Sequence, residues 1–364
     1  MLSSCGRQTT ALQEDGDTVP FKYARRLTVV RYADYTTVTL QNPWKEGKTL
    51  HRYVLVPAAA DLPEALPEGT VIRTPLKQSV IFTTVHSALL QMLHAEERIA
   101  GVADLKYIKI PYIHDQVAKG RIVDCGDGMS PVIEKIIDLH PDALLLSPFE
   151  NSGGYGQLEE IDIPIVECAE YMEPSPLGRA EWVRFYGMLY GCEHEADSLF
   201  ALVDSNYHAL MSEVKRQMND GKRKPTTLLD KITGSVWYVP GGRSTIGCML
   251  ADAGADYPWA DDEHSGSVAL PFETVLERAG ESDVWLLRYS SKQKLTRQQL
   301  LSEHRGYNQF RSYREGRVYG CNVEQSLFYE ESPFRPDLLL SDFIRILHPE
   351  ALPQYELRYY HLIE

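Results

Sequence analysis

Three short runs near the start of the chain combine β-branched and aromatic residues, a composition that is typical of strands. They begin at Leu27, Tyr35 and Tyr53. Turn signals at Asn42-Pro43 and Glu46-Gly47 separate the last two runs. We therefore expect strands ahead of the first helix.

From about residue 71 the pattern alternates between short aliphatic runs and longer amphipathic segments. The aliphatic runs predict strands over residues 71–74, 99–102, 121–124, 142–147 and 163–167. The longer segments predict helices over residues 85–94 and 131–139. This alternation favours a parallel sheet with helices on both faces.

Residues 177–222 have a helical pattern with no strand inside it. Apolar side chains recur at spacings of three and four and form one stripe: Ala196, Leu199, Phe200, Val203, Tyr207, Leu210 and Val214. We expect Gly187 and Gly191 to divide this region into a short helix and a long one. The long helix, from 193 to about 220, would run roughly 40 Å and join two domains.

A second alternating set follows. Strands are expected over residues 227–230, 236–239, 284–287 and 317–320, and helices over 245–253, 272–279 and 337–347. The whole pattern predicts an α/β protein with two Rossmann-like lobes joined by one long α-helix. We place the first lobe at residues 21–176, the connecting helices at 177–222 and the second lobe at 223–364.

Charge and hydropathy narrow the choice of partners. The 364 residues include 37 Lys and Arg against 51 Asp and Glu, which gives a formal net charge of −14. A protein that binds phosphates of nucleic acid needs a basic face, so we expect no nucleic-acid partner. No run approaches the roughly 20 consecutive apolar residues that cross a bilayer, so we expect a soluble folded part.

The sequence contains no compact signal for catalysis. Nucleophile-elbow, phosphate-loop, zinc-protease and dinucleotide-binding motifs are absent, and no two of the six cysteines form a Cys-x-x-Cys pair. The acidic segments 192–195 and 261–264 each contain a histidine, but they suit solvated turns better than metal sites. We therefore expect no enzymatic activity, no cofactor and no bound metal.

The first residues point to a lipid anchor. Leu2, Ser3, Ser4 and Cys5 resemble a bacterial lipobox, in which small residues precede a cysteine that receives lipid. The charged and apolar segments of a signal peptide do not precede them, so the chain is either a trimmed lipoprotein or matches by chance. On the first alternative, residues 1–20 are a tether, and the protein lies in the periplasm, anchored by lipid to a bacterial membrane.

Both halves of the chain contain one duplicated unit, in which a glutamate begins a short helix that precedes an aliphatic strand. Glu134 holds this position in the first half and Glu273 holds it in the second. This unit, the long helix and the closing segment 347–350 resemble the helical-backbone class (class III) of substrate-binding proteins of ABC importers. The resemblance covers roughly residues 70–350.

Further stretches are similar to a branch of this class from gut Bacteroidetes. They begin at Ser147, Tyr171 and Trp237. The resemblance implies a ligand cleft between the lobes, a stiff long helix that allows little closure, and an ABC permease dimer as partner. It also implies the ligand: an iron chelate such as a ferric siderophore, with a corrinoid (vitamin B12) or haem as the alternative.

Ligand-binding residues are expected in loops at the carboxyl ends of strands, where doubly wound sheets leave a crevice. The loop after Leu146 carries Phe149, Glu150, Asn151 and Tyr155. The aromatic rings offer flat apolar surface, and the two polar side chains can orient polar groups of a ligand. The alternative is an ordinary turn whose aromatic rings fold inward.

The loop after Val239 offers a second set: Trp237, Tyr238, Arg243 and Ser244. Glycines there let the backbone approach a ligand, and Arg243 lies at the positive end of a helix that Ser244 can cap. This arrangement suits an anionic chelate. The alternative is a capped turn without a binding role.

The resemblance gives Glu134 and Glu273 a different role. In the resembled class, glutamates at these positions meet arginines on the two permease subunits, so we expect both residues to dock the permease. The helix dipole alone also favours a carboxylate in a first turn, and a purely structural role stays open.

Overall fold

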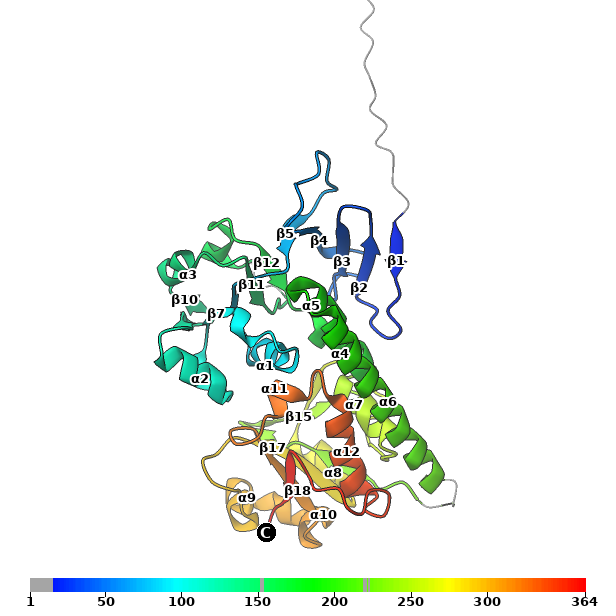
Figure 1. The fold of residues 1–364 in the computed structure, drawn as a ribbon. Coiled ribbons are helices and arrows are strands. Elements are labelled where there is room, and N and C mark those ends of the chain that lie inside the picture. Colours follow the sequence, from blue (N-terminus) through cyan, green and yellow to red (C-terminus); the bar gives the residue numbers. More distant parts are fainter. Residues whose placement is uncertain (1–15, 151–153, 219–220, 222) are drawn as a thin grey trace, which may run out of the picture.

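The computed structural model of the protein describes residues 16–150, 154–218, 221 and 223–364. Figure 1 shows two lobes, one above the other in this view, with a long helix running along one side of both. We name the part before the long helix the first lobe and the part after it the second lobe. The predicted α/β fold with two lobes and one long helix is confirmed.

A five-stranded sheet opens the first lobe. Its strands are β1 (Asp17–Val19), β2 (Leu27–Arg31), β3 (Thr36–Gln41), β4 (Thr49–Pro57) and β5 (Thr70–Thr74), in that spatial order. The first four pair antiparallel, and β5 pairs parallel to β4. The three early strands are therefore confirmed, whereas the strand expected at 71–74 belongs to this sheet and not to the alternating part.

A parallel sheet in the order β12-β11-β6-β7-β8 forms the rest of the first lobe. Its strands are β6 (Ser79–Ile81), β7 (Ile99–Val102), β8 (Val123–Asp124), β11 (Ala143–Leu146) and β12 (Ile165–Glu167). Its connections contain α1 (Thr84–Met92), α2 (Pro111–Ala118), α3 (Ile133–Leu139) and the paired β9 (Gly126–Asp127) and β10 (Ser130–Pro131). Because all neighbours are parallel, the carboxyl ends of the five strands share one edge.

The connecting helices are α4 (Pro176–Glu181), α5 (Val183–Tyr190) and α6 (Glu193–Met218). Gly191 ends α5 with φ +67°, a left-handed conformation that glycine adopts without strain. Gly187 does not divide the region as expected, because it lies inside α5. A Cβ there would come within 2.6 Å of the Cβ of Ala196, so this glycine permits close packing of α5 on α6.

Two buried carboxylates fasten the chain between β1 and β2 to the connecting helices. Glu181 accepts hydrogen bonds from the backbone nitrogens of residues 22–24 at 2.7–2.8 Å. Glu173 accepts from those of the next two residues and from the indole nitrogen of Trp182. Buried carboxylates need such donors, and these bonds hold the N-terminal sheet against the connection.

The second lobe contains two sheets. The mainly parallel one has the order β13-β17-β18-β19, with β13 (Thr227–Leu229), β17 (Val284–Tyr289), β18 (Val318–Asn322) and an antiparallel edge strand β19 (Tyr360–Leu362). The antiparallel one contains β14 (Ile232–Thr233), β15 (Val236–Pro240) and β16 (Ser267–Leu270). The strand expected at 236–239 therefore lies outside the parallel sheet, because a tight turn with Gly234 at φ +64° folds it back on β14.

Helices surround these sheets. They are α7 (Thr245–Asp252), α8 (Phe272–Ala279), α9 (Arg297–Glu303), α10 (Arg311–Arg314), α11 (Phe328–Glu331) and α12 (Pro336–Leu347). Short 3₁₀ turns at Glu96–Arg98, Leu105–Tyr107, Gly156–Glu159, Glu170–Met172 and Arg305–Gln309 complete the described elements.

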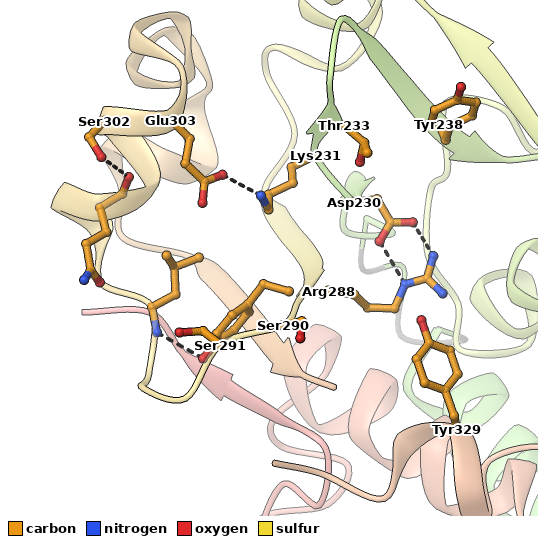
Figure 2. A pocket seen from close by; sticks show the side chains of 13 residues that line it. Asp230, Lys231, Thr233, Tyr238, Arg288, Ser290, Ser291, Ser302, Glu303 and Tyr329 are labelled. Atoms are coloured by element: carbon orange, nitrogen blue, oxygen red, sulfur yellow. Dashed lines mark hydrogen bonds and ion pairs between the residues drawn. The ribbon is translucent and has the colours of Figure 1, made fainter. Parts of the chain in front are cut away.

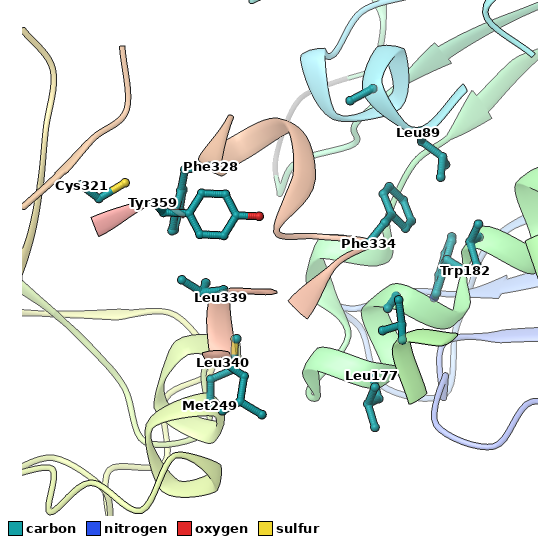
Figure 3. Packing of buried hydrophobic residues seen from close by; sticks show 14 of the residues in the cluster. Leu89, Leu177, Trp182, Met249, Cys321, Phe328, Phe334, Leu339, Leu340 and Tyr359 are labelled. Atoms are coloured by element: carbon teal, nitrogen blue, oxygen red, sulfur yellow. The ribbon is translucent and has the colours of Figure 1, made fainter. Parts of the chain in front are cut away.

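The hydrophobic core continues from one lobe into the other. Figure 3 shows Phe334, which lies between α11 and α12, beside Leu89 and Trp182 of the first lobe. The ring of Phe334 lies 5.9 Å from that of Tyr186 in an edge-to-face contact. The lobes are thus joined by a packed apolar contact as well as by α6, which supports a connection that closes little on ligand binding.

Candidate functional site

A hollow of about 500 Å³ lies at the carboxyl edge of the parallel sheet in the first lobe. We name it the first-lobe hollow. Its lining comes from the ends of β6 and β11 and from the loops that follow β7, β9 and β11, and includes Phe82, Thr83, Met129, Leu146, Phe149 and Tyr155. Phe149 and Tyr155 thus line the hollow, and Phe149 is 48% exposed, while their expected contact with a ligand stays a prediction.

Tyr155 presents its ring to the hollow while its hydroxyl is already engaged. The hydroxyl donates a hydrogen bond to Glu167 Oε1 at 3.2 Å. Burial, together with the charge of Glu167, raises the pKa of the Tyr155 phenol. Tyr155 therefore offers apolar surface and not a phenolate at neutral pH.

The polar residues of this loop contribute less than expected. Glu150 is exposed, and its side chain is not part of the hollow's lining. Asn151 lies outside the described residues, so its expected role stays a prediction. Met129, which was not expected to contact a ligand, lines the hollow and is 80% exposed.

A second hollow, of about 630 Å³, lies in the second lobe, and Figure 2 shows its side chains. We name it the second-lobe hollow. Asp230 follows β13, Arg288 and Ser290 stand at the end of β17, and Tyr238 of β15 and Tyr329 of α11 face the same space. These hydroxyl, guanidinium and carboxylate groups make this hollow more polar than the first-lobe hollow.

Two ion pairs organise the second-lobe hollow. Arg288 binds Asp230 through two hydrogen bonds, from Nε at 2.9 Å and from a terminal nitrogen at 2.6 Å. Burial lowers the pKa of Arg288, but the charge of Asp230 outweighs burial and raises it. Lys231 pairs with Glu303 at 2.5 Å. The four charges balance, so the hollow carries fixed dipoles without a net charge from these pairs.

Trp237 does not face the cleft, contrary to expectation. It is completely buried, and its indole nitrogen donates to the carbonyl oxygen of Leu229 at 2.8 Å. Its ring packs between Trp285 at 5.7 Å and Phe310 at 5.5 Å. Successive strand residues point to opposite faces, so Tyr238, the next residue, is the one that reaches the hollow.

Arg243 and Ser244 also lie away from the lining of both hollows. Arg243 is exposed and pairs with Glu263 at 2.8 Å. Ser244 caps α7 as its spacing suggested, because its hydroxyl oxygen accepts a hydrogen bond from the backbone nitrogen of Gly247 at 3.0 Å. For these two residues the structure favours the capped-turn alternative.

Residues at the ends of β13 and β17 line the second-lobe hollow, whereas Arg243 and Ser244 of the expected loop after Val239 do not. Asp230, Arg288 and Ser290 were missed, although the rule that located Phe149 applies to them as well. Each follows a buried aliphatic run, and polar residues directly after such a run were the available signal.

Both hollows lie next to the same contact between the lobes. Thr83 lines the first-lobe hollow, and the next residue, Thr84, donates a hydrogen bond to Glu330 at 3.0 Å. Glu330 follows Tyr329 of the second-lobe hollow in α11. Lys109 adds bonds from the first lobe to the carbonyl oxygens of Val323 and Ser326. Both hollows therefore open beside the same interlobe contact.

The glutamates expected to dock a permease occupy equivalent places. Glu134 lies in the first turn of α3 and Glu273 in the first turn of α8, and both are exposed. Among the described residues, neither carboxylate has an ion-pair partner within 4 Å. Their accessibility fits a docking role, which stays a prediction.

Other features bear on the choice of site. A hollow of about 800 Å³ lies on the N-terminal sheet, where Arg25, Trp44 and Lys48 line it. In the part of the chain that the structure describes, no three histidine, cysteine, aspartate or glutamate side chains are grouped as a metal site requires. No helix of the described ranges has the length and apolar character of a membrane span. Cys5 lies outside those ranges.

Several known proteins are similar to this chain in sequence or in fold. An uncharacterized lipoprotein of Methanocaldococcus jannaschii is 26% identical over 93% of this chain and 84% of its own length. A periplasmic haem-binding protein of Pseudomonas aeruginosa has a TM-score of 0.61 at 15% identity, covering 79% of this chain and 98% of that one. A structure from an Fe³⁺-hydroxamate transport system of Saccharomonospora viridis has a TM-score of 0.55 at 20% identity, covering 75% and 92%.

The family model gives the most specific result. The model of the periplasmic binding protein family matches residues 80–324, which is more than half of the 364-residue chain. That range contains both hollows almost completely and excludes the N-terminal sheet. The chain therefore belongs to the periplasmic binding protein family, the solute-binding components of ABC transporters.

Proposed function

We propose that this protein captures an iron chelate, such as a ferric siderophore, between its lobes and delivers it to the permease dimer of an ABC importer. The observation that carries the proposal is the pair of hollows, one at the carboxyl edge of each parallel sheet, beside one interlobe contact. The oxygen and nitrogen groups of the second-lobe hollow suit a chelate rich in oxygen atoms. The likeness to a structure from an Fe³⁺-hydroxamate transport system supports the same ligand class.

Haem or a corrinoid is the second candidate, and the first-lobe hollow favours it. Phe149 and Met129 are unusually exposed for apolar side chains, at 48% and 80%. A flat macrocycle would remove both from water, which would stabilise the complex. The haem-binding protein of similar fold supports this candidate.

We propose further that Cys5 carries lipid and that residues 1–20 tether the protein in the periplasm. The uncharacterized lipoproteins among the relatives support this. The same proposal includes the lobe boundaries at 21–176, 177–222 and 223–364. It also includes the likeness to a branch from gut Bacteroidetes. A Cys5→Ala variant should leave the membrane fraction and stay folded, whereas unchanged fractionation would contradict the anchor.

The ligand can be identified directly. Mass spectrometry under native conditions should detect a small molecule carried through purification, and the absorbance spectrum after exposure to each ligand separates haem, corrinoid and ferric chelate by their different visible bands. Calorimetric titration then tests the site with Tyr238→Ala and Phe149→Ala. Each should weaken binding by roughly five- to thirtyfold, as loss of a buried contact does.

Leu62→Ala serves as the matched control. Leu62 is 59% exposed in the loop between β4 and β5, outside both hollows. Its loss should leave affinity unchanged. If the protein retains no iron chelate, haem or corrinoid, or if all three variants bind equally well, the proposal fails.

A further inference from the structure

A small cavity of about 150 Å³ lies between the lobes, next to the second-lobe hollow. We name it the interlobe cavity. Arg288 and Tyr329 line both spaces, so the two are neighbours. Arg179 of α4 enters it from the connecting helices, and Thr245 of α7 enters it from the second lobe. Most of the remaining lining is apolar.

Arg179 is half-buried and lacks the carboxylate partner that such an arginine normally has. Its Nε is shut off from solvent and has no hydrogen-bond partner. Among the described residues, no carboxylate oxygen lies within 4 Å of its guanidinium. Arg288, in the same cavity, instead holds Asp230 through two hydrogen bonds. Burial lowers the pKa of Arg179, against the opposing charge of Glu170.

Glu170, the buried carboxylate whose charge acts on Arg179, already has other partners. Glu170 lies 3.4 Å from the Nε2 of His86 and accepts a hydrogen bond from the hydroxyl of Tyr186 at 2.9 Å. Burial disfavours charge on both groups, but the neighbouring Cys168 and Glu170 raise the pKa of His86, and the charge of His86 lowers the pKa of Glu170. Glu170 thus contacts His86 and Tyr186, and it forms no ion pair with the guanidinium of Arg179 at the cavity.

The beginning of α7 adds to this positive potential. Thr245 and Ile246, the first two residues of the helix, line the interlobe cavity. The hydroxyl oxygen of Ser244, which caps the helix, accepts a hydrogen bond from the backbone nitrogen of Gly247. The positive end of the helix dipole thus lies beside the unpartnered arginine, in apolar surroundings that strengthen charge interactions.

We propose that the interlobe cavity binds one anionic group of the captured ligand, a carboxylate, phosphate or similar oxyanion, held by Arg179 from one side and Arg288 from the other. The inference rests on the proposed function, because it names a chemical property of the ligand. The cavity is too small for a whole chelate, so it takes one group while the body of the ligand occupies the larger hollows. An anionic ligand would complete the pairing that Arg179 lacks.

Inorganic phosphate, titrated calorimetrically at constant ionic strength, is the first probe. Wild-type protein should bind one phosphate, and Arg179→Met should weaken that binding by about tenfold or more, as loss of a charge-assisted pair does. Arg243→Met is the matched control, because Arg243 is exposed and outside both hollows, and it should bind phosphate as the wild type does. Absence of saturable phosphate binding, or equal affinity in wild type and Arg179→Met, would overturn the inference.

A second readout separates binding from folding. Removal of a half-buried charge that has no carboxylate partner should leave the melting temperature of the ligand-free protein unchanged or raise it. The opposite result is a large fall in the melting temperature of Arg179→Met, while both Arg179→Met and Arg179→Lys bind phosphate as the wild type does. That result would give Arg179 a structural role and overturn the subsite.

Iron complexes distinguish failure of the subsite from failure of the proposed function. Ferric citrate carries free carboxylates and should depend on Arg179, whereas an uncharged ferric trihydroxamate should not. Phosphate binding that depends on Arg179, without binding of either iron complex, would support the subsite and reject iron chelates as ligands. Binding of both iron complexes with equal affinity by wild type and Arg179→Met would reject the subsite and keep the proposed function.

Discussion

Trp237 and Tyr238 are neighbours on β15 with opposite surroundings. The indole of Trp237 is completely buried among Trp285, Phe310 and the carbonyl oxygen of Leu229, whereas Tyr238 is 46% exposed in the second-lobe hollow. Alternation along a strand sets this difference. We therefore expect Trp237 to contribute to stability and the adjacent Tyr238 to contribute to ligand binding.

Trp237→Ala should lower the free energy of unfolding by about 3–5 kcal/mol, because it leaves a cavity and an unpaired carbonyl in the core. Tyr238→Ala should change it by less than about 1 kcal/mol. Urea unfolding of both variants measures these changes. A Trp237→Ala variant as stable as the wild type would contradict the core assignment.

Glu167 should make stability depend on pH. Burial, assisted by the charge of Glu159 and opposed by the hydrogen bond from Tyr155, raises the pKa of Glu167 from 4.5 to about 7. Its Oε2 has no hydrogen-bond partner among the described residues. Between these pH values the folded protein keeps a proton that the unfolded chain has lost, so the free energy of unfolding falls as pH rises.

The loss amounts to about 3 kcal/mol between pH 4.5 and 7. Glu167→Gln removes the titrating group and should remove this part of the pH dependence. The free energy of unfolding of the variant should therefore increase relative to that of the wild type as pH rises. Urea unfolding of both proteins across the range tests the difference. Parallel stability curves would show that Glu167 titrates normally.

The residues that line a hollow could be predicted from the sequence only where the preceding strand was assigned to the correct sheet. The loop after Leu146 was located because its strand is an aliphatic run inside a parallel sheet. The loop after Val239 misled because β15 has the same appearance but pairs antiparallel with β14 and β16. Sheet membership depends on contacts distant in the sequence, and strand composition does not encode it.

Elements with a long periodic pattern could be predicted, and short ones could not. α6 follows its apolar stripe over 26 residues, so its span from Glu193 to Met218 agrees closely with the expected one. β6 has only three residues and α11 only four, too few to display a period. Yet β6 stands at the centre of its sheet and α11 carries Tyr329 into the second-lobe hollow.

The contact of α5 with α6 gives a prediction at the scale of elements. An alanine inside a helix normally stabilises it relative to glycine. At Gly187, however, the added Cβ would lie 2.6 Å from that of Ala196, and the two helices would have to separate.

Gly187→Ala should therefore lower the free energy of unfolding by about 1–3 kcal/mol. Gly266→Ala is the control, because no atom lies within 4 Å of a Cβ built there. Thermal or urea unfolding measures both. Equal stabilities of the two variants would mean that α5 and α6 are not packed as closely as described.

At the scale of the whole molecule, the glutamates proposed to dock the permease lie apart from the two hollows. Glu134 and Glu273 begin α3 and α8 and lie outside the lining of both hollows. Charges at a transient interface mainly set orientation and association rate. Glu134→Ala and Glu273→Ala should therefore keep ligand affinity and thermal stability while transport by a reconstituted importer falls sharply.

Glu64→Ala, which removes an exposed carboxylate in the loop between β4 and β5, is the matched control and should transport normally. If the two helix variants instead bind ligand poorly or melt much earlier, with transport per bound ligand intact, both glutamates are structural. The docking role would then be wrong.

The location of iron in a complex tests the central claim most directly. Crystals grown with a ferric chelate and measured at the iron absorption edge should show one anomalous peak in the space bounded by Phe149 of the first lobe and by Tyr238 and Tyr329 of the second. A peak beside Trp44 on the N-terminal sheet, where the hollow of about 800 Å³ lies, would contradict capture between the lobes. So would a complex that retains no iron.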